Sequence, residues 1–158
     1  MPNWCENILT VTGENKELKK FISQATVKTK NYKTDFSINQ FVPCPKPLLK
    51  TTAPNDKNPK EMEKRYGASD WYEWKLINWN VKWDVEAVKT VNDKEVIYDF
   101  DSPWGSPIIA IHRISKLYPK LNFLIQYEEP GMYFSGIHEV KNGKIKQSKF
   151  HNNLKKFK

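Results

Sequence analysis

The first part of the chain changes from an alternating pattern of apolar residues to a helical one. Between Cys5 and Thr12, Leu9 and Val11 fall on one side of an extended chain, which is typical of a half-buried strand. After Gly13 the apolar spacing becomes that of an amphipathic helix. The apolar positions of this helix are Leu18, Phe21, Ile22 and Ala25. The pattern therefore predicts a strand followed by a helix.

A second alternating pattern and a run of prolines come next. Apolar and polar side chains alternate over residues 34–42, which predicts a second strand. Prolines are then frequent between 43 and 59, and because proline fixes φ and lacks an N–H, regular structure is disfavoured there. A short helix is expected only after Asn58, with Pro59 in its first turn. We expect residues 43–69 to form an insertion on the surface.

The second half of the chain predicts two hairpins, a helix and another strand. Turn residues at Asn92–Asp93 and at Asn142–Gly143 separate alternating segments, and the Asn-Gly pair is a strong hairpin signal. The paired segments are 83–88 with 95–100, and 132–140 with 144–150. Between the hairpins, isoleucines at helical spacing follow Pro107, and residues 121–127 have the pattern of a buried strand.

The order of these elements defines the expected fold. It is an α+β fold, an antiparallel sheet with two main helices packed on one face, related to the ferredoxin-like split βαβ arrangement and carrying a proline-rich insertion. The 158 residues suit one domain. We expect a single domain over residues 1–150 and a basic C-terminal tail over residues 151–158.

The segment Asn-Trp-Asn-Val-Lys-Trp-Asp at 78–84 has two interpretations. If it is extended, Trp79 and Trp83 share one face and leave Lys82 and Asp84 on the other. Tryptophans usually fill a core, and the polar residues would then form a solvated face. The alternative is a ligand surface in which Lys82 and Asp84 form a charge pair beside the aromatic rings. The sequence favours the core interpretation, and the ligand surface remains the alternative.

The chain is basic, with a formal net charge of +8. This charge favours anionic partners such as nucleic acid, a nucleoprotein or an acidic protein surface, although solubility alone would also account for it. From Lys144 to the end, aromatic residues are interleaved among lysines, and no acidic residue occurs. Such a tail neutralises phosphates and stacks on bases, unless it is only a solvated end. The candidate contact residues are Lys82, Trp104, Lys149, Lys155, Lys156 and Lys158.

Motifs of common catalytic and cofactor sites are absent from the sequence. It has no Walker loop, GxGxxG, GxSxG or HExxH, so we expect no enzyme, no cofactor and no metal. Cys5 and Cys44 are too few for a disulfide framework or a zinc knuckle. Neither a signal peptide nor a membrane-spanning apolar run is evident, so we expect the cytoplasm of a bacterial host. An enzyme would instead need five residues in one cleft: Lys82, Asp84, Glu128, Glu129 and His138.

Four short motifs occur in order along the chain. They are Pro-Asn-Trp-Cys-Glu-Asn at 2–7, Asn-Trp-x-x-Lys-Trp-Asp at 78–84, Ser-Pro-Trp at 102–104 and Glu-x-Gly-x-x-Phe-x-Gly at 129–136. Together they resemble the Api92-like proteins with a YubB ferredoxin-like domain, which are found on phages and plasmids. The resemblance implies the fold and a mobile-element origin, and it implies no reaction. Asn80 and Val81 stand where the family pattern has glycine and threonine, and asparagine tolerates a left-handed backbone.

These observations lead to one main functional hypothesis and two alternatives. The main one is a non-enzymatic accessory protein of a mobile element that binds a host nucleoprotein or its nucleic acid, such as a CRISPR effector or its guide RNA, and inhibits a defence system. A direct nucleic-acid-binding protein, with RNA favoured over DNA, is the first alternative. An enzyme acting on a nucleotide or nucleic acid is the second. The sequence does not indicate an oligomeric state.

Overall fold

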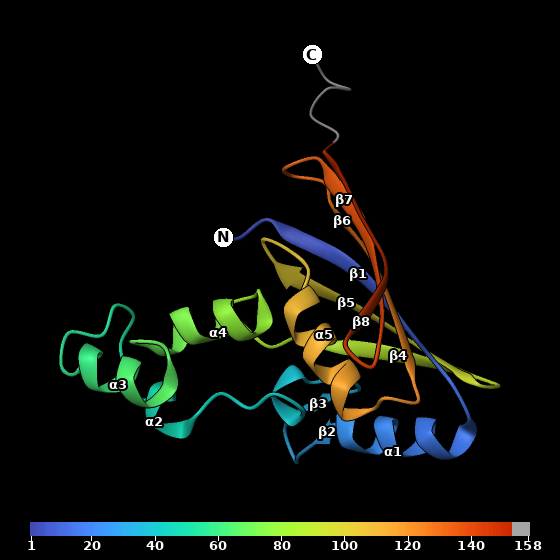
Figure 1. The fold of residues 1–158 in the computed structure, drawn as a ribbon, viewed down its shortest axis with the longest axis horizontal. Helices are drawn as coiled ribbons and strands as arrows, with labels where there is room; N and C mark the ends of the chain where they lie inside the picture. The colour runs from blue at the N-terminus through green and yellow to red at the C-terminus, as the bar shows by residue number, and fades with distance from the viewer. Residues whose placement is uncertain (153–158) are drawn as a thin grey trace.

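The computed structural model describes residues 1–152 and combines a large sheet, a small sheet and helices (Figure 1). The large sheet contains β1 (Trp4–Thr12), β4 (Ala87–Asn92), β5 (Glu95–Pro103), β6 (Asn122–Glu129), β7 (Phe134–Lys141) and β8 (Lys144–Asn152). The α-helices are α1 (Asn15–Ala25), α2 (Lys46–Leu49), α3 (Pro59–Tyr66), α4 (Trp71–Trp79) and α5 (Ile108–Leu117). The small sheet pairs β2 (Val27–Lys28) with β3 (Lys33–Thr34), and η1 (Ile38–Gln40) is a single 3-10 turn.

The large sheet has the strand order β4-β5-β1-β6-β7-β8, and all neighbours are antiparallel. Its first four positions, with α1 after β1 and α5 after β5, form the split βαβ arrangement, in which β1 and β5 are the central strands. The β7–β8 hairpin extends the sheet beyond β6. The ferredoxin-like α+β fold expected from the sequence is confirmed.

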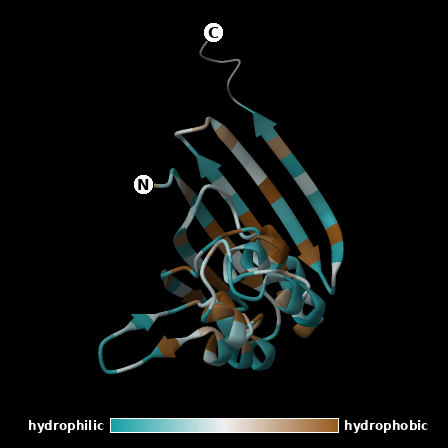
Figure 2. Cartoon of the chain, turned by 90° about the vertical axis from the view of Figure 1, so that its left-hand side faces the viewer, coloured by the Kyte–Doolittle hydropathy of each residue, from teal (hydrophilic) through white to brown (hydrophobic). Residues whose placement is uncertain are grey.

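One face of this sheet is covered by helices, and the other is open. On β1 the side chains alternate strictly, so that Cys5, Asn7, Leu9 and Val11 are buried while their neighbours are exposed or half-buried. In Figure 1 the helices lie to the left of and beneath the strands, and Figure 2 shows the alternating hydropathy along the strands. Phe21 of α1 is central to the core beneath the covered face. Its ring lies against those of Phe36, Phe41, Tyr98, Tyr118 and Phe123.

The strand predicted over residues 34–42 is wrong. Only Lys33–Thr34 is extended into a strand, and the chain then crosses the core as a loop that ends in η1. Residues 34–38 are all buried, because the loop packs between the helices and the edge of the sheet. Side chains form hydrogen bonds with the backbone of this loop in place of the strand pairing that a sheet would provide. Asp84, for example, accepts hydrogen bonds from the Ile38 and Asn39 N–H groups at 2.7 and 3.2 Å.

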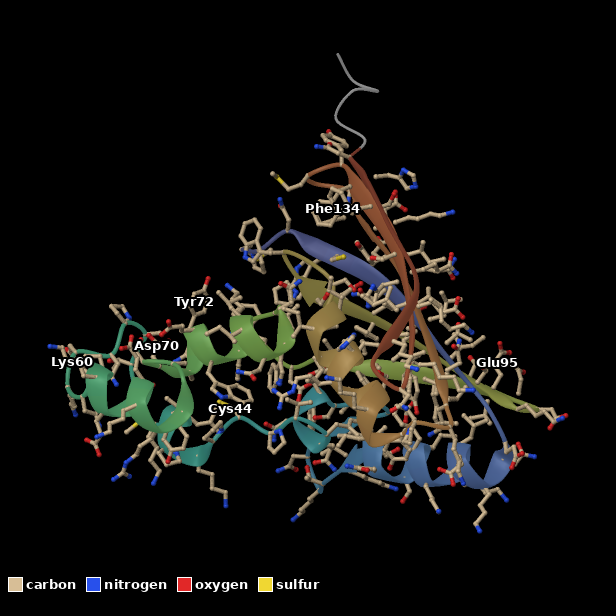
Figure 3. The ribbon with its side chains drawn as sticks, viewed as in Figure 1. Cys44, Lys60, Asp70, Tyr72, Glu95 and Phe134 are labelled. Atoms are coloured by element: carbon tan, nitrogen blue, oxygen red, sulfur yellow. The ribbon has the colours of Figure 1, made fainter. Side chains whose placement is uncertain are left out.

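The proline-rich segment is helical and leads into α4, and together α2, α3 and α4 form a helical lobe (Lys46–Trp79) beside the sheet (Figures 1 and 3). The helix expected from Pro59 is confirmed as α3, whereas α2 was not expected. Residues 43–69 are more than a surface loop, because Leu48 and Met62 are buried in the core cluster. Asp70 caps α4 by accepting a hydrogen bond from the Glu73 N–H at 2.8 Å.

Residues 78–84 are not extended. α4 ends at Trp79, and Asn80 terminates it with φ of 71°, in the left-handed conformation that asparagine tolerates. The Asn80 side-chain amide also donates to the Ser106 carbonyl at 3.0 Å. The turn separates the two tryptophans: Trp79 is buried, while Trp83 is 41% exposed. Their expected common face does not exist, and the core interpretation holds for Trp79.

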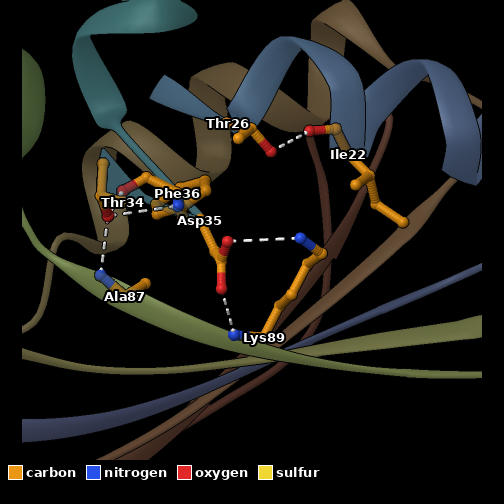
Figure 4. Close-up of polar contacts among 7 residues, drawn as sticks. All are labelled: Ile22, Thr26, Thr34, Asp35, Phe36, Ala87 and Lys89. Atoms are coloured by element: carbon orange, nitrogen blue, oxygen red, sulfur yellow. Dashed lines mark hydrogen bonds and ion pairs between the residues drawn. The ribbon is translucent and has the colours of Figure 1, made fainter. Parts of the chain in front are cut away.

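We expect the Asp35→Asn substitution to lower the free energy of unfolding by about 1–2 kcal/mol at pH 7. Asp35 accepts hydrogen bonds from the Lys89 N–H and ammonium group at 2.9 and 3.2 Å, and so joins the loop after β3 to the edge strand β4 (Figure 4). Burial raises the pKa of this carboxyl, but the two bonds and the charge of Lys89 outweigh it and lower the pKa below its ordinary value.

The stabilisation by Asp35 is therefore complete above the pKa of the unfolded carboxyl and is lost as the pH falls through the lower, folded pKa. Urea unfolding of wild type and Asp35→Asn at pH values from 7 to 3 measures this. The difference in stability should shrink toward acid. Asp93→Asn, in the exposed β4–β5 turn, is the matched control and should change stability little at any pH. A pH-independent loss at Asp35 would contradict the assignment.

Candidate docking surface

The face of the large sheet opposite α1 and α5, called the open face below, consists of exposed side chains from the central strands. Ile8 of β1 is 37% exposed and lies between Asp99 of β5 and Gln126 of β6 in the register. Asp99 and Gln126 are also exposed. The centre of this sheet face is therefore exposed and mostly polar, with Ile8 as an apolar side chain between polar neighbours.

Three carboxylates stand side by side across the centre of the open face. Glu6 of β1 lies directly opposite both Asp101 of β5 and Glu128 of β6, and we call these three residues the carboxylate row. Opposed side chains in such a register have Cβ atoms about 4.5–5.5 Å apart, so like charges there destabilise the sheet. Within residues 1–152, none of the three side chains forms a salt bridge or a hydrogen bond. The row is unpaired although the chain carries 26 lysines and arginines.

Two hollows flank the carboxylate row. The larger, of about 650 Å³, is lined by all three carboxylates of the row together with Ile8 and Gln126. The smaller, of about 420 Å³, lies between Asp101, Glu86 and Trp4. Both are shallow depressions, and the carboxylates that line them leave the open face strongly acidic in a basic protein.

Aromatic rings border the smaller hollow. The rings of Trp4 and Trp83 are 6.3 Å apart with an interplanar angle of 38°, and the Lys82 ammonium lies 4.2 Å from the centre of the Trp83 ring. Trp4 and Trp83 are each about two-fifths exposed. The structure therefore joins the first two sequence motifs at the surface, and it places Lys82 over an aromatic ring instead of in a charge pair with Asp84.

The other predicted contact residues are spread out. Trp104 is half exposed. Its backbone N–H donates to the Asn3 carbonyl at 2.8 Å, which places Trp104 beside Trp4 at the end of the sheet. Lys149 is also on the open face, but it lies on the edge strand β8, three strands away from β1. Lys155, Lys156 and Lys158 lie outside the described residues.

The first and third motifs, which lie at the start of β1 and at the end of β5, also have a structural role. The Asn7 side-chain amide is buried and donates to the Cys5 carbonyl at 2.9 Å and to the Ser102 hydroxyl at 2.8 Å. The Ser102 hydroxyl in turn donates to the Gly105 carbonyl. These bonds fix the loop that carries Trp104. Burial, with smaller contributions from nearby carboxylates, raises the pKa of the Cys5 thiol to about 12, which disfavours the thiolate form that a nucleophile requires.

The last motif shapes the β6–β7 turn. Glu129 is fully buried and accepts hydrogen bonds from the Gly131 and Met132 N–H groups, both at 2.7 Å. A side chain at Gly131 would meet the Glu129 carboxylate at 2.8 Å, and one at Gly136 would meet the Tyr127 ring, at 2.2 Å from its hydroxyl oxygen. Both glycines are therefore required by close packing.

The five residues that an enzyme would need do not share a cleft. Glu128 and Glu129 point to opposite faces of the sheet, as expected for neighbours in a strand. Asp84 is engaged by the loop at 37–39, and His138 lies on β7 with Nδ1 3.2 Å from the hydroxyl of a serine in β8. In the part of the chain that the structure describes, no group of histidine, cysteine and acidic residues is placed to hold a metal ion. None of the described helices has the length and apolar character needed to cross a membrane.

The fold and the clustered motifs define a ferredoxin-like α+β protein with an open sheet face. Residues 78–153 match the family described as the ferredoxin-like domain in Api92-like protein, so this part of the chain is similar to that domain. Three of the four motifs fall within the matched residues. The resemblance inferred from them is confirmed.

The whole chain is also similar to a solved structure of this kind. The crystal structure of a protein api92 from Yersinia pseudotuberculosis superposes with a TM-score of 0.60 at 11% sequence identity, and the similarity covers 96% of this chain and 98% of that one. At this identity the similarity concerns the fold alone. Among curated proteins, none matches this chain.

Proposed function

We propose that the protein is a non-enzymatic binding protein that engages a macromolecular partner through its open face. The observation that supports this most directly is the unpaired carboxylate row, bordered by exposed tryptophans on a sheet face that the described helices do not cover. Like charges placed opposite each other disfavour folding of the isolated sheet, so their arrangement is better explained by a partner than by stability.

The family resemblance supports a setting for this activity. A mobile-element accessory protein acts in the cytoplasm of its bacterial host, and a host defence nucleoprotein such as a CRISPR effector is our proposed target. An acidic docking face repels the phosphates of nucleic acid. The proposed contact is therefore with the protein component of the target, and binding inhibits the target by covering a functional surface.

A pull-down from host lysate tests this proposal. The bait variants are wild type, Gln126→Trp, which fills the larger hollow without changing charge, and Asn31→Trp, which places the same side chain on the exposed β2–β3 turn. We expect wild type to capture a protein partner even after nuclease treatment. The Asn31→Trp bait should still capture this partner, and the Gln126→Trp bait should not. A partner retained equally by both variants would contradict docking on the open face.

A second candidate function rests on a different observation. Lysines line the β7–β8 edge of the sheet, away from the carboxylate row. They are Lys141, Lys144, Lys146 and Lys149. Edge-strand lysines also protect a sheet from edge-to-edge association, so they have a structural explanation as well. If nuclease removes the captured partner, direct nucleic-acid binding, to RNA before DNA, becomes the better proposal, and affinity should then fall steeply with salt and on Lys149→Glu.

A further inference from the structure

We infer that the partner segment that docks on the open face is arginine-rich. This inference rests on the proposed function and adds the chemistry of the ligand. It identifies the occupant as an extended, positively charged stretch of a partner protein lying along the carboxylate row and ending against Trp4.

Charge complementarity selects a cationic occupant. The carboxylates of Glu6, Asp101 and Glu128 are exposed and lack a basic partner among residues 1–152, while the rest of the chain holds a large excess of positive charge. Asp99, which is next to Asp101 on the same face of β5, adds a fourth exposed carboxylate. A basic segment would remove the repulsion that the register creates. A phosphate-bearing ligand would increase it.

The aromatic border favours arginine over lysine. A guanidinium group is planar, stacks on an indole face and still pairs with a carboxylate through two parallel N–H groups. Trp4 precedes Glu6 on the same face of β1 and lines the smaller hollow together with Asp101 and Glu86. The hollow thus offers a stacking surface and carboxylates at one place. A lysine ammonium uses only part of this arrangement.

Calorimetric titration with a capped nona-arginine peptide tests the inference on the full chain. Because the protein is itself strongly basic, net charge opposes this binding, and only a local acidic surface supports it. We expect saturable binding that weakens with salt. The affinity for nona-lysine should be lower than that for nona-arginine by at least about fivefold. Trp4→Leu should reduce this preference for arginine.

Two charge-matched triple variants locate the site. The first, Glu6→Gln with Asp101→Asn and Glu128→Gln, neutralises the carboxylate row. The second, Glu14→Gln with Glu61→Gln and Glu63→Gln, removes three exposed carboxylates, one directly before α1 and two in α3. We expect the first to weaken nona-arginine binding about tenfold or more and the second to change it less than about twofold. The unfolding midpoint of the row variant should be equal to or above that of wild type, which separates loss of binding from loss of fold.

Four results would overturn the inference. The first two are no binding of nona-arginine and equal weakening by both triple variants. The third is self-association in ultracentrifugation that the row variant abolishes, since a second copy would then be the occupant. The fourth is a lysate partner lost with Gln126→Trp but retained by the row variant. That last result would leave the proposed function intact and show that its partner is not basic.

Discussion

Replacing Phe21 with alanine is expected to lower the free energy of unfolding by about 3–5 kcal/mol. The ring is fully buried, and it lies 4.9 Å from the Phe41 ring and 5.2 Å from that of Tyr118. These contacts connect α1 to the loop after β3 and to the end of α5, so alanine leaves a cavity among elements that are far apart in sequence. Domains of this kind are typically stable by about 5–15 kcal/mol, so the loss is a large share of the total.

Urea unfolding followed by far-ultraviolet circular dichroism measures this loss. Phe150→Ala is the matched control, because the Phe150 ring also contacts another aromatic ring, that of Phe134 at 5.6 Å, but is 63% exposed on β8. We expect the control to cost less than about 1 kcal/mol. A similar cost for both variants would mean that Phe21 is not central to the core.

The second large effect is expected at Trp79. Its indole N–H donates to the Val42 carbonyl at 2.8 Å, and its ring packs edge-on against that of Trp74. Trp79→Ala removes this packing and leaves a buried carbonyl without its donor, which should cost about 3–5 kcal/mol. Trp79→Phe keeps most of the volume and loses the hydrogen bond, so it should cost about 1–3 kcal/mol.

Trp83→Ala is the internal control for Trp79, since both tryptophans come from one motif. Because Trp83 is on the surface, its loss should cost less than about 1 kcal/mol of stability while impairing binding at the smaller hollow. Thermal or urea unfolding of the three variants gives the order of their losses of stability. If Trp83→Ala were as destabilising as Trp79→Ala, the division of this motif into a core and a surface part would be wrong.

The elements with a strong local pattern could be predicted from the sequence. The strand at Leu9 and Val11, the helix at Phe21 and the hairpin at Asn142–Gly143 all formed as expected, because their period and turn residues agree with their tertiary surroundings. The stretch at 34–42 alternates just as clearly, but its residues 34–38 are all buried, and its backbone is bonded by side chains from elsewhere. Alternation alone does not separate a strand from such a loop.

The open face could not be found from the sequence because it depends on register. Glu6, Asp101 and Glu128 are scattered along the chain, and no spacing rule joins them. Only the pairing of β1 with both β5 and β6 places the three carboxylates in one row. The net charge of +8 even pointed the other way, toward anionic ligands, because a sum over the chain does not show where the charges lie. Trp4 and Lys82, in contrast, stood out as parts of motifs.

The central position of β1 has a consequence for how the protein is made. β1 is synthesised before the other strands of this sheet, yet Leu9 pairs with Tyr98 on one side and Ile125 on the other. Contacts at such sequence separation form slowly, because a long loop must close first. During translation this apolar strand therefore waits with both edges unpaired until most of the chain has left the ribosome. A nascent chain in this state exposes unpaired strand edges, and the sheet is complete only when β6, β7 and β8 have followed.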